Sequence, residues 1–129
     1  MQASLGQLLL VGAGGFVGAV LRFVLSGVVQ DLVPQASLPY GTLAVNAAGC
    51  LAIGVLGGIA DARQAVGPEL RLFLLIGVLG GFTTFSTFSY ETLVLARDGQ
   101  HVGAGLNVVL SVGLCLLGAW LGYGLGSTA

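Results

Sequence analysis

Four long apolar segments, separated by short polar stretches, account for nearly the whole chain. Each is close to or longer than the ~20 residues that an α-helix needs to cross a hydrocarbon core about 30 Å thick. The stretches between them collect proline, glycine and charged residues, as loops do. The pattern predicts an all-α integral membrane protein with a single domain, residues 1–129, of four transmembrane helices. The predicted spans are residues 5–29, 40–60, 70–95 and 102–125.

A polar interruption divides the third segment. From Gly80 to Glu91 the sequence reads GGFTTFSTFSYE, in which five Ser and Thr residues are interleaved with phenylalanines. Irregular backbone at membrane depth survives only where it is buried in protein or lines a wet cavity. We therefore expect the third helix to be broken at Gly80–Gly81 and the hydroxyl-bearing stretch to form a membrane-embedded ion site.

Composition excludes several classes of function. Hydrophobic residues make up 56% of the chain and charged residues only 7%, which is too apolar for an ordinary soluble domain. There is no lysine, and the few arginines form no basic surface, so we expect no nucleic-acid partner. The four spans leave no soluble catalytic domain, and we expect no enzymatic activity.

Small residues are expected to pack the helices. Gly-x-x-x-Gly pairs occur in all four spans, and in lipid such pairs let helix backbones approach closely. Cys50 and Cys115 lie in apolar segments without Cys-x-x-Cys spacing, and we interpret them as packing residues rather than as a disulfide or as metal ligands. Asn107, Ser111 and Cys115 recur at four-residue spacing and predict a polar stripe on one face of the last span.

The arginines leave the orientation of the chain open. If both termini lie on one side, Arg63 and Arg71 lie on that side, and Arg22 and Arg97 lie on the other. Because Lys and Arg near span ends set orientation, a balanced count predicts insertion both ways and pairing of oppositely oriented copies. The alternative, in which the first span fixes one orientation, is left open with equal weight.

Three motifs together resemble the Fluc (CrcB-like) family of fluoride channels. They are GAVLRF at 18–23, YGTLAVNAAGC at 40–50 and GGFTTFSTFSYE at 80–91. The resemblance covers essentially the whole chain. It implies an antiparallel, dual-topology homodimer in the bacterial inner (plasma) membrane, in which two parallel pores passively export cytoplasmic fluoride and so reduce its toxicity.

The resemblance also implies roles for individual residues. Phe85 and Phe88 would line the pore, where the positive edge of a phenyl ring can stabilise an anion without trapping it. The Asn46 amide could donate to fluoride, although an interhelical hydrogen bond is an equal alternative from sequence. Arg22 could attract anions or simply anchor the span at the interface. The further pore positions implied are Ser111, Thr42, Thr87 and Glu91.

A structural sodium ion, Na⁺, is the cofactor that the resemblance implies. It would lie at the centre of the dimer interface, held by the backbone carbonyls of Gly80 and Thr83. Carbonyl oxygens suit a hard cation, and a broken helix frees them. The identity of the ion as sodium rests on the resemblance alone.

A small dual-topology, proton-coupled efflux transporter is the alternative function. Such a protein exchanges protons at a membrane-embedded carboxylate. The first, second and fourth spans contain no acid, and Glu91 lies late in the third, which argues against this function. A purely structural membrane protein is a third possibility, but it would leave the string of Thr, Ser and Phe residues unexplained.

Overall fold

The computed structural model describes residues 1–129 and contains helices but no strands. Four helical stretches are long and apolar enough to cross a membrane, which confirms the predicted all-α architecture. Each stretch starts at, or up to two residues before, the start of the span predicted from sequence, and it ends two or three residues after the predicted end. The helices are α1 (Leu5–Leu32), α2 (Tyr40–Arg63), α3 (Pro68–Arg71), the π-helical η1 (Leu72–Leu79), α4 (Gly80–Phe82), α5 (Phe85–Arg97) and α6 (His101–Thr128).

Local sequence signals set several helix ends. Ser4 and Gln7 form a capping box at the start of α1, in which each side chain bonds to the other residue's backbone N–H. After α2, Gln64 adopts a left-handed conformation that ends the helix. Pro68 then occupies the first turn of α3, where its missing N–H removes no helical hydrogen bond.

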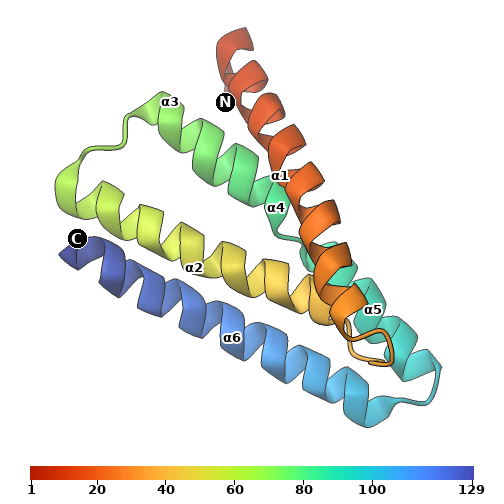
Figure 1. Cartoon of the computed structure of the whole chain (residues 1–129). Coiled ribbons are helices and arrows are strands. Elements are labelled where there is room, and N and C mark those ends of the chain that lie inside the picture. The colour runs from red at the N-terminus through yellow and green to blue at the C-terminus, as the bar shows by residue number, and fades with distance from the viewer.

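Helices α2 and α6 run side by side in the same direction along most of their lengths (Figure 1). Their backbones approach closely because glycines face the partner helix. A Cβ at Gly54 would meet the backbone of Ala119 and Tyr123, and one at Gly122 would meet the backbone of Leu51 and Val55. Two glycine-bearing faces therefore form the most extensive helix contact in the structure, as expected for helices packing in lipid.

Helix α1 crosses the first half of the third span rather than lying along α2 and α6 (Figure 1). Gly14 meets Gly77 at this crossing, where a Cβ on either glycine would come within 2.9 Å of the other's Cα. Gly81 likewise lies against the backbone of Gly15. The glycine pairs predicted to pack helices are thus found at the crossing points.

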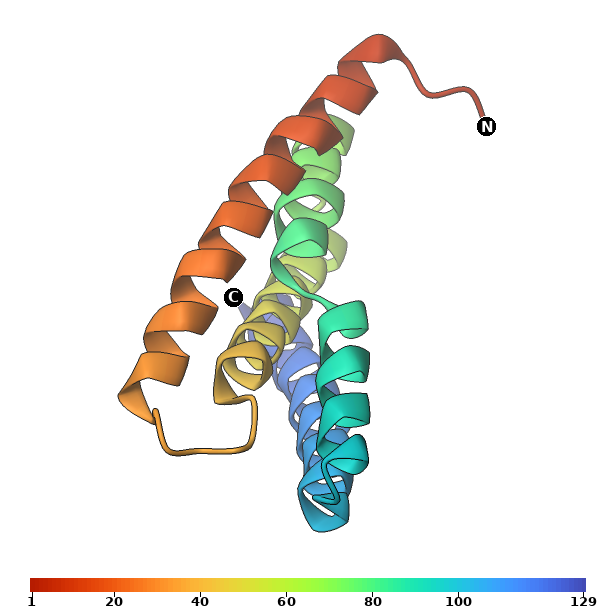
Figure 2. The ribbon, with the colours of Figure 1, turned by 90° about the vertical axis from the view of Figure 1, so that its right-hand side faces the viewer.

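The third span is broken, as predicted, but the break lies beyond the glycine pair. Gly80 and Gly81 are helical, and the residues with extended backbone are Thr83 and Thr84. Figure 2 shows the chain leaving α4 and restarting in α5 at this point. Gly81 serves instead for close approach, because it packs against the backbone of the first helix. The site of the break is set by side chains that bond to the threonine backbone, described below.

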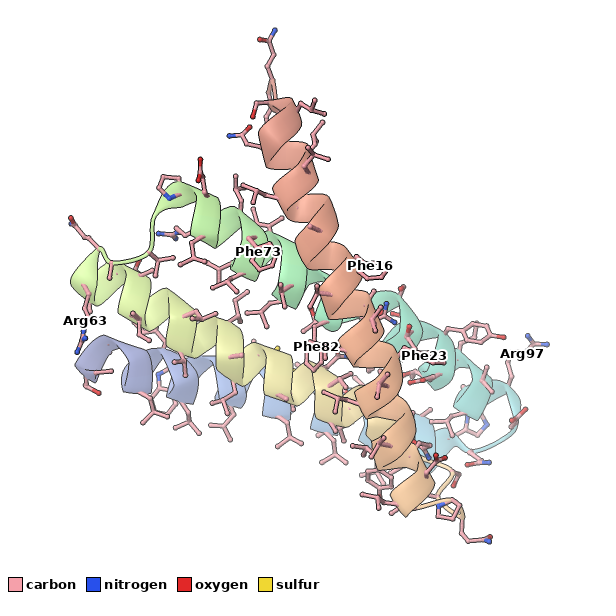
Figure 3. All side chains as sticks on the ribbon, turned by 45° about the horizontal axis from the view of Figure 1, so that its top comes forward. Phe16, Phe23, Arg63, Phe73, Phe82 and Arg97 are labelled. Atoms are coloured by element: carbon pink, nitrogen blue, oxygen red, sulfur yellow. The ribbon has the colours of Figure 1, made fainter.

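Most of the apolar surface of a single chain is uncovered. Only 20 of 129 residues are buried, and large hydrophobic side chains face outward on every span. Figure 3 shows Arg63 and Arg97 at opposite ends of the molecule, as the arginine count above assumes. Lipid, further protein or both must therefore cover the outer faces between these two charged ends.

Candidate ion site at the helix break

The backbone at the break is held by one amide side chain. Asn46, on α2, accepts a hydrogen bond from the Thr84 N–H at 2.7 Å and donates one from its Nδ2 to the Thr84 carbonyl at 3.0 Å. Asn46 is only 8% exposed and Thr84 is half-buried, so both bonds are partly shielded from solvent. The interhelical hydrogen bond considered as an alternative for this residue is therefore present. Its NH2 group still has a second hydrogen to donate.

The helix resumes with a threonine cap. The Thr84 hydroxyl oxygen accepts a hydrogen bond from the Thr87 N–H at 3.2 Å, and the Thr84 hydroxyl donates to the Thr87 hydroxyl at 3.0 Å. This is the N-cap arrangement in which a side chain replaces a missing helical partner. Thr87, one of the predicted pore positions, is accordingly engaged in starting α5.

The break leaves specific carbonyls without their helical partners. In a continuous helix, the carbonyls of Gly80 and Thr83 would accept from the N–H groups of Thr84 and Thr87. Both of these N–H groups instead donate to side chains. The intervening Gly81 carbonyl accepts from Nε of Arg22 at 3.1 Å. The two carbonyls predicted to hold a cation are therefore among those that lose their helical donors at the break, and oxygen ligands of this kind fit sodium.

A cavity of about 320 Å³ opens beside the break. Its walls come from α2, the break, α5 and α6. It has room for several small ions or waters, since water occupies about 30 Å³ in the liquid. It brings together four of the predicted pore residues, Asn46, Phe85, Phe88 and Ser111. The full lining is Asn46, Cys50, Thr83, Thr84, Phe85, Phe88, Ser111, Val112, Cys115 and Leu116.

The two phenylalanines form a tilted pair at this cavity. Their ring centroids lie 5.2 Å apart and the ring planes make an angle of 54°. Phe88 is buried, whereas Phe85 is 76% exposed on the single chain. The tilt turns one ring edge toward the other ring's face, which is the favoured geometry for aromatic pairs.

The predicted polar stripe on α6 is extended by a residue of α5. Ser111 donates to the Asn107 side-chain oxygen at 3.4 Å, and Asn107 Nδ2 donates to the Thr92 hydroxyl at 2.8 Å. Thr92 in turn donates to the Phe88 carbonyl at 2.8 Å. This chain of bonds joins the cavity wall to the helix that carries the phenylalanines. Thr92 was not among the predicted site residues, and its only sequence signal is a hydroxyl within an apolar span.

Other predicted positions lie outside the cavity lining. Thr42 donates to one carboxylate oxygen of Glu91 at 2.8 Å, linking α2 to α5 one turn away from Asn46 and Phe88. The second carboxylate oxygen of Glu91 is buried and has no hydrogen-bond partner. Arg22 lies at the break through its bond to Gly81. The structure thus groups the predicted residues into the cavity, the break and the Thr42–Glu91 pair.

Comparisons with known proteins agree with the motifs. Residues 9–123 match the family described as "CrcB-like protein, Camphor Resistance (CrcB)". A protein of Elusimicrobium minutum named "Fluoride-specific ion channel FluC" is 49% identical over 119 residues, which cover 92% of each chain. Proteins with the same name from Rhodospirillum rubrum (46% identity, 89% of this chain and 90% of the relative) and Geobacter sulfurreducens (50% identity, 89% and 92%) are similarly close.

Proposed function

The chain belongs to the CrcB-like protein family, and we propose that it is a fluoride-specific channel through which fluoride leaves the cytoplasm. It is a multi-pass protein of the bacterial inner membrane and a channel rather than an enzyme. The observation that carries the proposal is the cavity at the helix break, where two phenyl rings, an amide and a hydroxyl meet.

The chemistry of the cavity suits a small, strongly hydrated anion. Phenyl ring edges carry partial positive charge, and the free N–H of Asn46 and the Ser111 hydroxyl can donate to an anion. None of these groups carries a full charge that would bind the ion too tightly to release it. Phe85 and Phe88 would replace part of the hydration shell, and Asn46 would supply a directional hydrogen bond.

The direction of transport follows from the membrane potential. A negative interior favours outward movement of a monovalent anion by about 2.3 kcal/mol per 100 mV. A passive pore therefore suffices to lower cytoplasmic fluoride. A proton-coupled transporter would need an accessible carboxylate on the path, whereas Glu91 lies outside the cavity lining and bonds to Thr42. Flux through the channel should accordingly be independent of a pH gradient.

Expression in bacteria that lack their own fluoride exporter tests this function. Cells carrying the chain should grow at fluoride concentrations that stop the parent strain, and cells carrying Phe85→Ile should not. Equal membrane levels of the two proteins must be verified. If the unaltered chain gives no resistance at such levels, the proposed function is wrong.

The channel in this proposal is an antiparallel homodimer with two pores. The exposure of Phe85 supports it, because a pore-lining ring that is 76% exposed on one chain needs a further wall. The balanced arginines at the two ends of the chain support insertion in both orientations. A second, inverted copy would close both cavities by the same contact, as an isologous interface does.

Added charges can test dual topology. Gln2 and Gln64 lie on the side of the termini, and Gln35 and Gln100 lie on the other. Arginines at either pair should bias all copies to one orientation. Each double variant alone should fail to protect cells from fluoride, and co-expression of the two should restore protection. Full activity of either variant alone would contradict an antiparallel dimer.

A sodium ion held by the carbonyls of Gly80 and Thr83 completes the proposal. The diverted hydrogen bonds at the break support it, because they leave these oxygens available to a cation. Arg22 satisfies the Gly81 carbonyl between them, so that this oxygen need not be a ligand. Sodium should raise the unfolding temperature of purified protein relative to potassium or N-methylglucamine, since a ligand that binds only the folded state stabilises it. Identical unfolding in the three salts would contradict the site.

A further inference from the structure

The structure brings the two cysteines of the chain together. Cys50 on α2 and Cys115 on α6 are free thiols, and both line the cavity at the helix break. Cys50 lies one helical turn before Gly54, and Cys115 lies one turn before Ala119. The backbones of Gly54 and Ala119 meet where α2 packs against α6, so the two thiols lie at the same level of this interface. Each is partly exposed rather than enclosed by packing on all sides. Their sequence positions, in different spans, gave no indication that they would meet.

The position of the pair along the pathway is defined by its neighbours. Cys50 follows Asn46 by one helical turn on α2, and Cys115 follows Ser111 by one turn on α6. The thiols therefore lie one turn from the amide and the hydroxyl on the same cavity wall. An ion held between them would occupy space through which a conducted ion must pass.

We propose that Cys50 and Cys115 form a binding site for a soft, two-coordinate metal cation of the mercuric class, and that its occupation blocks the pore. Binding forms two metal–sulfur bonds and breaks two S–H bonds. Two protons leave, and no electrons are transferred. A dication and two thiolates sum to zero charge, which avoids the cost of a net charge at membrane depth.

The ligand set selects the metal. Soft thiolates favour soft cations, and a pair of sulfurs can satisfy an ion that takes two ligands. Zinc in a structural site takes four ligands, and the chain has no group of three or more His, Cys, Asp or Glu side chains that could hold it. The site should therefore bind mercuric ion and discriminate against zinc.

Binding can be measured without reference to conduction. Purified protein is mixed with one equivalent of mercuric chloride, an excess of 2-mercaptoethanol is added, and bound mercury is counted after desalting. Two thiols on one protein act as a chelate, so the unaltered chain should retain one mercury per chain. The variants Cys50→Ser and Cys115→Ser each leave one thiol. They should retain at least ~10²-fold less mercury, because the second metal–sulfur bond can no longer form within the same protein. Zinc chloride should not be retained by any of the three.

Three results would overturn the proposal. They are equal mercury retention by a single-serine variant and the unaltered chain, binding of two mercury ions per unaltered chain, or no mercury retention at all.

The consequence for the pore rests on the proposed function and is measured separately in liposomes. Mercuric chloride should stop fluoride efflux through the unaltered chain, and dithiothreitol should restore it. Each serine variant should show the same efflux with the metal as it shows without it. Retained mercury with unchanged efflux would refute the block, and retained mercury in a protein that never conducts would refute the proposed function alone.

Discussion

Asn46 and Thr84 exchange two hydrogen bonds across the interface between α2 and the break in the third span. The Asn46 side chain accepts from the Thr84 N–H at 2.7 Å and donates to the Thr84 carbonyl at 3.0 Å. One amide thus satisfies both backbone groups of a residue that has left the helix. The same exchange diverts the N–H that would otherwise bond to the Gly80 carbonyl, so it links the cavity-lining amide of Asn46 to the proposed sodium ligands.

Replacing Asn46 by leucine should destabilise the break. The substitution keeps the size of the side chain but leaves the Thr84 N–H and carbonyl unpaired, at a cost of about 1–3 kcal/mol for each buried group. We expect a lower unfolding temperature in detergent and loss of fluoride flux. Gln2→Leu, at an exposed position before α1, is the control and should leave both unchanged. Unfolding of Asn46→Leu at the temperature of the unaltered protein would contradict this role.

Phe85→Ile should separate conduction from stability. Phe85 is 76% exposed, so the change removes little packing within the chain, but it removes the phenyl edge from the cavity. Fluoride flux through the variant should fall at least tenfold. Its circular dichroism spectrum should match that of the unaltered protein and so show that it is still folded. Phe16→Ile is a matched control, because Phe16 is 73% exposed on α1 and lies outside the cavity lining. Equal flux in the two variants would remove Phe85 from the pathway.

Gly122→Ala should weaken the contact between α2 and α6. A Cβ at this position would collide with the Leu51 carbonyl oxygen, and overpacking of this kind typically costs about 1–3 kcal/mol. Gly124→Ala is the control, since a Cβ there meets nothing within 4 Å. Thermal unfolding in detergent should show a drop only for the first. A stable Gly122→Ala would mean that the two helices can separate without loss.

Arg22 tests whether charge or geometry matters at the break. Arg22→Lys keeps a positive charge that could anchor the span, but it lacks the Nε–H that reaches the Gly81 carbonyl at 3.1 Å. Arg22→Gln removes the charge as well. If Arg22 positions the break, both variants should lose most fluoride flux and any stabilisation by sodium. Full activity of Arg22→Lys would instead favour a purely interfacial anchor.

Hydropathy was sufficient to predict the spans, because crossing a membrane demands long apolar helices whatever their packing. The broken third helix was also predictable, because irregular backbone at membrane depth needs polar groups around it and the dense hydroxyls of this stretch supply them. Its location at Thr83 and Thr84 was not. Gly81 is used for close approach to α1, and the break is set by Asn46, which is distant in sequence.

Contacts between spans account for what the sequence could not predict. The bond from Arg22 to Gly81 and the placement of Cys50 and Cys115 in one cavity wall both depend on which helix faces which. Hydrophobic periodicity reveals little of this in a span that is apolar on all sides. The motif resemblance identified Phe85 and Phe88 as candidate pore residues, but the fold was needed to show that both line one cavity.

Fluoride efflux from liposomes containing the purified protein tests the central claim most directly. Efflux is read with a fluoride electrode after valinomycin sets a potassium diffusion potential, and chloride is measured in parallel. A selective pore lined by Phe85 and Phe88 predicts rapid fluoride loss, no chloride loss above that of empty liposomes, and no dependence on a pH gradient. Absence of fluoride loss at verified reconstitution, or equal loss of chloride, would contradict the account.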